Sequence, residues 1–263
     1  MFNSIDLFAG AGGLSCGLSQ EGIVSSLAVE IEKDFCNTFK LNHKNCTVIN
    51  EDIRNIDFYA LTQEPKYGVF DLVCGGPPCQ GFSTVGKKNE QDERNSLFWQ
   101  FLRAVREINP KVVLFENVSG FKKLYNSIAY HTLKKELHLL GYHIKSDVLD
   151  SANFGSPQHR KRTIVVGFKN GLDFNFPEAT HSKNGCMFTQ KYNVLSDAIS
   201  DLPKLNSNDE KNRYLACKTQ YQKDIRGSGT VLTEHNSTNY GEKMKTIMSM
   251  IPKNGSVKDL PKK

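Results

Sequence analysis

The sequence predicts an α/β fold: a mostly parallel sheet with helices on both faces. Over about the first 170 residues, short apolar runs alternate with segments whose apolar residues recur at helical spacing. Strands separated by helices in this way pair in parallel, and the helices cover both faces of the sheet. A glycine-rich turn, Gly10–Gly13, joins the first apolar run to the first helix. Such sheets bind ligands beyond the carboxyl ends of their strands, so we expect the functional site there.

The elements of this region follow in order along the chain. Seven strands are expected, at Ser4–Phe8, Ser26–Glu30, Thr47–Asn50, Phe70–Cys74, Lys111–Phe115, Ile144–Leu149 and Arg162–Phe168. Four helices are expected between them, at Leu14–Gln20, Asp34–Leu41, Ser96–Ile108 and Ser127–Leu140. The last of these is closed by Gly141, as expected of a C-cap. Two shorter helical fragments follow near Leu195–Leu202 and Tyr240–Ile251.

Composition excludes several classes of protein. The 263 residues contain no apolar run of roughly 20 residues that could span a bilayer. The N-terminus has no basic segment followed by an apolar one, so it is not a secretion signal. The seven cysteines are scattered and form no CxxC pair, which argues against a disulfide framework and a zinc site. We therefore expect a reduced, cytoplasmic protein with no metal and no membrane contact.

Charge divides the chain into two domains. Residues 1–179 carry 20 basic and 20 acidic residues, whereas residues 180–263 carry 14 basic and 8 acidic ones. The whole excess of +6 therefore lies in the second segment. A basic extension beside a neutral domain indicates contact with a polyanion, and a solvated lysine-rich surface is the alternative.

The glycine-rich turn and two acids predict a nucleoside site. Gly10 and Gly12 let the backbone approach a ligand closely, although a plain glycine turn is the alternative. Glu30, about 20 residues later at a strand end, can accept hydrogen bonds from both hydroxyls of a ribose. Asp52, after the third strand, can accept from an adenine amino group, and Ile31 can pack on the adenine face. Each of these residues alone suits an ordinary surface acid or core residue better, but their order at successive strand ends indicates a nucleoside pocket. The sequence has no GxxxxGK[ST] element, so the nucleoside is not expected to be ATP.

The sharpest signal is the run Cys74-Gly-Gly-Pro-Pro-Cys-Gln-Gly-Phe-Ser83. It follows a strand, and its glycines and prolines fix a rigid turn with Cys79 at the tip. A cysteine is a nucleophile as its thiolate, which a loop near backbone amides and arginines can stabilise. A buried structural role suits Cys74, which lies inside the strand, but suits Cys79 poorly.

Two further strand ends supply polar groups. Glu116 directly follows the fifth apolar run and is a candidate acid, with helix capping as the alternative. In the run Gln158-His-Arg-Lys-Arg162, alternation places Arg160 and Arg162 on one face of a strand. Two arginines aimed at one place suit a phosphate or a carbonyl oxygen. An edge strand protected by charge is the alternative.

Taken together, these motifs resemble the C5-cytosine-specific DNA methyltransferases of bacterial restriction-modification systems. The motifs DLFAGAGG, GGPPCQGFS, FENV and QHRKR occur in the family's order and approximate spacing. The resemblance implies a Rossmann-like fold and S-adenosylmethionine as cofactor. The cofactor contacts that it implies are Phe8, Gly10, Gly12, Glu30, Ile31, Asp52, Pro78 and Leu97.

The resemblance also implies a mechanism on double-stranded DNA. The target cytosine would be flipped out of the duplex, and the Gly81–Arg94 loop would close over the DNA. Cys79 would add to C6, Glu116 would donate to N3, and Arg162 would hold O2. Arg160 would support the site or a phosphate.

The chain also departs from the family pattern. Its last conserved blocks are missing, so residues 1–179 are expected to be the catalytic and cofactor-binding domain, and 180–263 the start of an incomplete target-recognition region. A split enzyme with a second subunit, a truncated chain and an inactive relative are the three explanations. A tRNA cytosine methyltransferase, and a fragment that binds cofactor or DNA without turnover, are the alternative functions.

Overall fold

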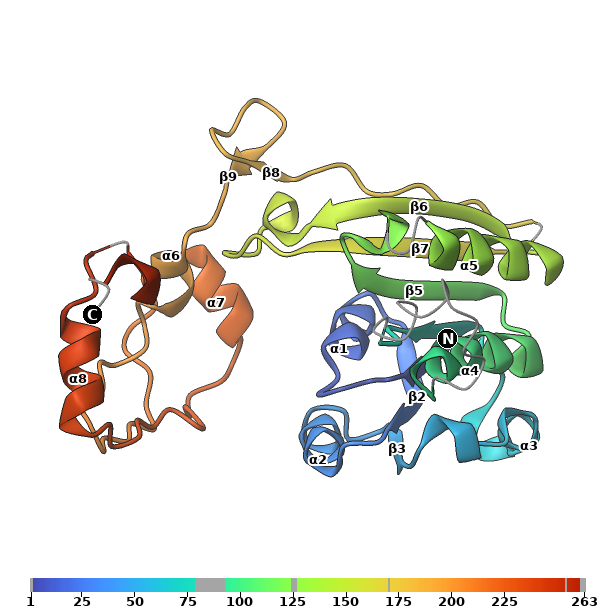
Figure 1. The fold of residues 1–263 in the computed structure, drawn as a ribbon, viewed down its shortest axis with the longest axis horizontal. Helices are drawn as coiled ribbons and strands as arrows, with labels where there is room; N and C mark the ends of the chain where they lie inside the picture. The colour runs from blue at the N-terminus through green and yellow to red at the C-terminus, as the bar shows by residue number, and fades with distance from the viewer. Residues whose placement is uncertain (1, 79–92, 124–126, 170, 254, 261–263) are drawn as a thin grey trace. The chain divides into compact units, whose positions relative to one another are not determined.

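The computed structural model describes residues 2–78, 93–123, 127–169, 171–253 and 255–260 (Figure 1). The chain divides into two compact units. The first comprises residues 1–153 and 159–179, and the second comprises residues 154–158 and 180–263.

The first unit is built on a seven-stranded sheet in the order β3-β2-β1-β4-β5-β7-β6. Its strands are β1 (Asn3–Leu7), β2 (Val24–Glu30), β3 (Thr47–Asn50), β4 (Leu72–Gly75), β5 (Val112–Val118), β6 (His143–Asp150) and β7 (Lys161–Phe168). The strands from β1 to β5 pair in parallel, whereas β7 pairs antiparallel with both β5 and β6. The predicted mostly parallel sheet is therefore confirmed, with β7 as its reversed strand.

Helices connect these strands. They are α1 (Gly13–Gln20), α2 (Lys33–Asn42), α3 (Phe58–Thr62), α4 (Glu93–Ile108) and α5 (Ile128–Leu139). Short 3-10 turns lie at η1 (Ile53–Asn55), η2 (Pro65–Tyr67), η4 (Phe121–Lys123) and η5 (Ser151–Phe154).

The two faces of the sheet have different interiors. On one face, Leu27 and Val29 belong to a large apolar core with side chains of α4 and α5, including Phe101 and Leu133. Ala28 points to the opposite face because side chains alternate along a strand. There it packs with Cys36 and Phe39 of α2 in a second, smaller cluster. Helices thus cover both faces, as the sequence predicted.

Several boundaries differ from those expected. β1 ends at Leu7, because Phe8 adopts a positive φ of 58° that an extended strand cannot hold. β5 runs on to Val118 and so includes Glu116. β7 begins at Lys161, so Arg160 precedes the strand instead of sharing a face of it with Arg162.

The second unit contains shorter elements. They are β8 (His181–Ser182), β9 (Gln190–Lys191), α6 (Leu195–Ile199), α7 (Gln220–Arg226), α8 (Glu242–Ser249) and η6 (Val257–Asp259). Polar contacts link them: Gln222 Nε2 donates to Ser200 Oγ at 2.7 Å, and Arg226 pairs with Asp201 at 3.6 Å. The sequence did not predict α7, which begins with a capping box at Thr219 and Gln222.

A buried carboxyl anchors the start of α1 to the sheet. Asp6 of β1 is 1% exposed, and Ser15 Oγ of α1 donates to its Oδ2 at 2.6 Å. Ser15 Oγ also lies 2.9 Å from Ser25 Oγ of β2. Burial raises the pKa of Asp6 to about 6, because the ionised form loses its hydration there.

We predict that Asp6→Asn flattens the pH dependence of stability. The folded chain holds the Asp6 proton up to about pH 6, whereas the ordinary pKa is 3.8. The free energy of unfolding therefore falls by on the order of 3 kcal/mol as the pH rises from 3.8 to about 6. The Asp6→Asn variant has no proton to lose there, so its stability does not fall in this way. Urea unfolding at half-unit steps from pH 4 to 7 measures it. Asp57→Asn, at an exposed helix cap that asparagine serves equally well, is the control. Equal pH slopes in all three chains would contradict the assignment to Asp6.

Candidate active site

A cavity of about 350 Å³ lies at the carboxyl ends of β1 to β4. The residues that line it are Phe8, Gly10, Val29, Glu30, Ile31, Phe35, Glu51, Asp52, Ile53, Arg54, Gly76, Pro78 and Leu97. Its volume falls within the range of small-molecule sites, about 300–1,000 Å³. Parallel pairing brings these strand ends together, although their residues are far apart in the sequence.

The structure brings seven of the eight predicted cofactor residues to this cavity. They are Phe8, Gly10, Glu30, Ile31, Asp52, Pro78 and Leu97. The eighth, Gly12, does not line it.

Glu30 lies in the cavity wall with its carboxylate held by backbone amides. The residue is 8% exposed, and its Oε2 accepts from the N–H of Gly10 at 2.8 Å. Its Oε1 accepts from the N–H of Glu32 at 2.9 Å. Each carboxylate oxygen can accept a second hydrogen bond, so both can still receive a ligand hydroxyl. The group is thus fixed in place and available, as a ribose-binding acid must be.

Gly12 lies where the glycine-rich turn packs against α2. It has a φ of +92°, and a Cβ there would lie 2.6 Å from the ring of His43 and 2.8 Å from Phe39. His43 Nε2 lies 3.1 Å from the carbonyl oxygen of Gly12, which precedes α1. The glycine is therefore required by backbone conformation and by close packing against α2.

The Asp52 carboxylate is paired with Arg54, which is partly exposed. Its Oδ1 accepts from the N–H of Arg54, and its Oδ2 lies 2.5 Å from the Arg54 guanidinium. These contacts lower the pKa of Asp52, the Arg54 side chain contributing most. Arg54 also lines the cavity and was not predicted as a site residue. An adenine amino group would have to share the Asp52 carboxylate with it.

Apolar side chains complete the cavity wall. Ile31 is 60% exposed and Phe35 is 49% exposed, although both are large hydrophobic residues beside a cavity. Leu97 of α4 contributes a third apolar group. Uncovered apolar side chains next to a fixed carboxylate suit a ligand with a flat heterocycle and a ribose, so the residues present fit the adenosine part of S-adenosylmethionine.

The residues that follow β4 pass very close to the end of β5. A Cβ on Gly76 would lie 2.8 Å from Oε2 of Glu116. Buried Asn117 then donates through Nδ2 to the carbonyl oxygen of Pro77 at 2.9 Å. Asn117 was not predicted as a site residue, although its place in the Phe115–Val118 motif was a signal. Cys79, two residues beyond Pro77, lies outside the described residues, as does most of the Gly81–Arg94 loop.

Cys74 behaves as the sequence indicated. It is fully buried in β4, and its thiol donates to the carbonyl oxygen of Ile5 at 3.4 Å. Burial raises the pKa of this thiol well above its ordinary value, so it is not a nucleophile.

Glu116 and Arg162 form an ion pair across β5 and β7. Nε of Arg162 lies 2.8 Å from Oε1 of Glu116, and both side chains remain partly exposed. Arg162, near the start of β7, lies opposite Val118 at the end of β5. Because β7 runs in the reverse direction, its start lies at the same edge of the sheet as the carboxyl ends of the parallel strands. The two groups expected to contact a cytosine therefore lie together.

Arg160 is held through its backbone. Its N–H donates to Oδ1 of Asp150 at 3.1 Å, and its carbonyl accepts from the N–H of Ser151. Nδ1 of His159 lies 3.0 Å from Oδ2 of the same carboxylate. Buried Asp150, which was not predicted, thus fixes the segment that enters β7, and the side chain of Arg160 is exposed.

Two other features are absent from the part of the chain that the structure describes. No helix there is both long and apolar enough to cross a membrane. Within the same residues, no group of three or more histidine, cysteine, aspartate or glutamate side chains could hold a metal ion.

The chain is similar to several type II methyltransferases. M1.HphI of Haemophilus parahaemolyticus is 33% identical over 260 residues, which cover 98% of this chain and 63% of that protein. M.AquIA of Picosynechococcus sp. is 37% identical over 218 residues, which cover 76% of this chain and 88% of that protein. The chain therefore spans less than two thirds of M1.HphI but most of M.AquIA.

Solved structures agree on the fold. An Escherichia coli prophage protein described as a candidate DNA modification methyltransferase is 26% identical, with a TM-score of 0.66 over 98% of this chain and 67% of that one. A DNMT2 variant of Spodoptera frugiperda is 23% identical, with a TM-score of 0.57 over 68% of this chain and 53% of that one, and it supports the fold alone.

A family model described as C-5 cytosine-specific DNA methylase matches residues 2–262, almost the whole chain. Because this match spans almost the whole chain and the relatives above are 33% and 37% identical, we conclude that the chain belongs to the C-5 cytosine-specific DNA methylase family.

Proposed function

We propose that this chain transfers a methyl group from S-adenosylmethionine to C5 of a cytosine flipped out of double-stranded DNA. The observation that carries the proposal is the position of Gly76. It lines the Glu30 cavity, and a Cβ there would touch the carboxylate of Glu116. The cavity and the Glu116–Arg162 pair are therefore adjacent, at the end of the strand that leads to Cys79.

The proposed cofactor contacts follow from the cavity. Glu30 accepts from the ribose hydroxyls with the two oxygens that Gly10 and Glu32 hold in place. Ile31 and Leu97 pack on the adenine, and Asp52 lies at its edge. When bound, S-adenosylmethionine supplies an electrophilic methyl group. Phe8, Gly10 and Pro78 form the rest of the proposed contact surface.

The proposed catalytic groups act on the cytosine ring. The Cys79 thiolate forms a bond to C6, and electron density moves to C5, which becomes nucleophilic. Glu116 donates a proton to N3, while Arg162 donates hydrogen bonds to O2 and holds the Glu116 side chain. After C5 is methylated, a base removes the C5 proton, the proton on N3 returns to Glu116, and the bond from Cys79 to C6 breaks to release the thiolate. Exclusion of water strengthens each of these contacts.

The proposal extends to the second unit and to a partner. We propose that 180–263 begins the target-recognition region, and that a second subunit completes the enzyme. A tritium-transfer assay on DNA and on tRNA, with and without the product of the adjoining reading frame, tests it. Transfer to tRNA alone would overturn the DNA proposal, and full activity of the isolated chain would exclude the need for a partner.

We predict that Glu30→Gln weakens S-adenosylmethionine binding by about tenfold or more, since hydrogen bonds to a charged group contribute about 1.5–3 kcal/mol. The amide also places an N–H₂ donor against one of the two backbone N–H groups that now face the carboxylate. Isothermal titration calorimetry measures the dissociation constant. Glu32→Gln is the matched control, because that exposed residue contributes only its backbone to the contact. An unchanged constant in Glu30→Gln would refute the role.

We predict that Cys79→Ser abolishes methyl transfer and leaves cofactor affinity within about twofold. A serine hydroxyl is scarcely ionised at neutral pH, so it cannot replace the thiolate at C6. The same tritium assay measures transfer, under the conditions in which the unaltered chain is active, and calorimetry measures binding. Cys46→Ser is the control, because Cys46 lies on the α2 side of the sheet. Measurable turnover by the Cys79 variant would refute the covalent mechanism.

A further inference from the structure

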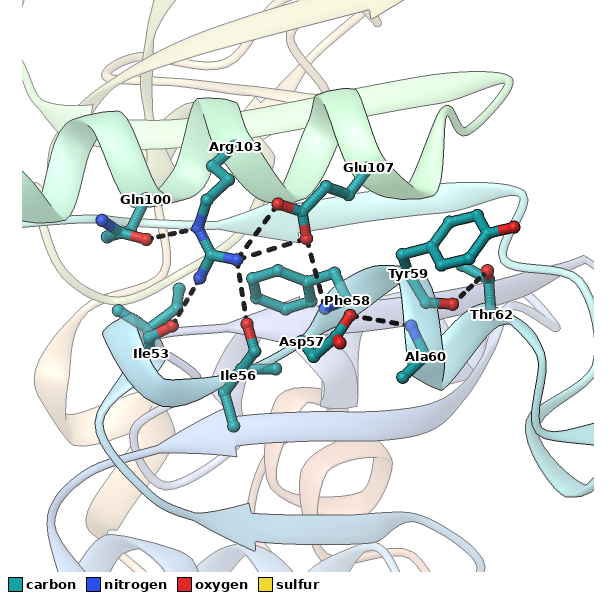
Figure 2. Close-up of polar contacts among 10 residues, drawn as sticks. All are labelled: Ile53, Ile56, Asp57, Phe58, Tyr59, Ala60, Thr62, Gln100, Arg103 and Glu107. Atoms are coloured by element: carbon teal, nitrogen blue, oxygen red, sulfur yellow. Dashed lines mark hydrogen bonds and ion pairs between the residues drawn. The ribbon is translucent and has the colours of Figure 1, made fainter.

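Arg103 joins helix α4 to the segment that follows β3. From α4 it reaches across to the loop that begins at η1, as Figure 2 shows. Its Nη2 donates to the carbonyl oxygen of Ile53 and its Nη1 to that of Ile56, both at 2.9 Å. These two carbonyls belong to residues that are 4% and 8% exposed.

The guanidinium is held on its other sides by its own helix. Nε donates to Oε1 of Gln100 at 2.5 Å, and Nη1 lies 3.2 Å from both carboxylate oxygens of Glu107. Its carbon lies 4.9 Å from the centroid of the buried Phe58 ring. All three guanidinium nitrogens are thus engaged, in a planar arrangement that lysine cannot reproduce.

Glu107 extends the same connection. Besides pairing with Arg103, its Oε2 accepts from the backbone N–H of Phe58 at 3.2 Å (Figure 2). One turn of α4 therefore holds the segment Ile53–Phe58 at three backbone positions, with the Arg103–Glu107 pair as the central contact.

The held segment and the holding helix form two walls of the cofactor cavity. Ile53 lines the cavity and directly follows Asp52. Leu97, which also lines the cavity, lies on α4 less than two turns before Arg103. Arg103 itself does not line the cavity, so it can act on a ligand only through these walls.

We propose that Arg103 is the positioning residue of the cofactor cavity, which fixes the distance between the η1 wall and the α4 wall. The inference rests on the proposed function for its ligand, S-adenosylmethionine. It adds a residue that the motifs of the sequence did not indicate. Without the guanidinium, the carbonyl of Ile56 loses its donor and the segment moves to recover hydration. Binding must then return the wall to its place, which reduces affinity.

Calorimetric titration with S-adenosylmethionine tests this role, at a temperature at which every variant is folded. Arg103→Met keeps the apolar stem and removes the donors, and is expected to weaken binding by about tenfold or more. Arg103→Lys, which can serve one carbonyl but not both, is expected to fall between this variant and the unaltered chain. The affinity for S-adenosylhomocysteine is expected to fall by the same factor, because that compound contains the same adenosine.

Two controls separate positioning from general destabilisation. Arg106→Met removes the neighbouring arginine of α4, which pairs with Glu136 of α5 at 3.6 Å. Leu137→Ala opens the core at α5 and lowers stability without touching the cavity wall. Both are expected to leave the dissociation constant within about twofold. In the transfer assay, Arg103→Met is expected to raise KM for the cofactor while kcat changes little.

The outcomes distinguish the two proposals. If the unaltered chain binds the cofactor and Arg103→Met binds it equally well, the positioning role is wrong and the proposed function stands. If Leu137→Ala loses as much affinity as Arg103→Met at equal stability, the effect is general destabilisation and the role is again wrong. If the unaltered chain binds neither S-adenosylmethionine nor S-adenosylhomocysteine, the proposed function fails, and the inference fails with it.

Discussion

The parallel pairing of β1 to β5 is the constraint on which the site depends. It brings five strand ends to one edge of the sheet, although they are spread over more than 100 residues of sequence. A different group lies at each end: the tight turn at Gly10 after β1, the carboxylate of Glu30 in β2 and the paired acid Asp52 after β3. The glycine-proline run follows β4, and the carboxylate of Glu116 lies in β5. Since neighbouring parallel strands lie about 4.8 Å apart, groups on adjacent ends necessarily come within reach of one ligand.

Within this frame, contacts between side chains and backbone groups hold the site together. The N–H of Gly10 fixes the Glu30 carboxylate, whereas Asp150 fixes the backbone of Arg160 and Asn117 fixes the carbonyl of Pro77. Each contact joins one strand end to another part of the chain. Together with the Asp52–Arg54 and Glu116–Arg162 ion pairs, these contacts position the groups of the site on the sheet.

Most of the fold and much of the candidate site could be predicted from the sequence. Apolar runs and glycine turns are local signals, so the strands and the residues at their ends were found. The antiparallel direction of β7 could not be predicted, because side chains alternate between the two faces of a sheet in the same way whichever direction the strand runs. Short helices such as α3 and α7 were missed, since a few residues give no helical period.

The sequence did not indicate Arg103 and Arg54, for two different reasons. Arg103 contacts carbonyls about 50 positions earlier, and any residue has a carbonyl. Arg54, by contrast, is only two residues from Asp52, but a surface ion pair has no distinctive pattern. The sequence thus indicated most of the predicted cofactor residues that line the cavity, whereas the contacts that hold them became visible only in the folded chain.

The reversed direction of β7 has an evolutionary consequence. Because β6 and β7 form a hairpin, both the end of one and the start of the other lie at the edge where the site is found. Lengthening a surface connection costs little conformational entropy, so segments can be gained or lost there while the sheet is unchanged. Insertions that alter what the site acts on can thus accumulate beside Arg162 without a new fold having to evolve.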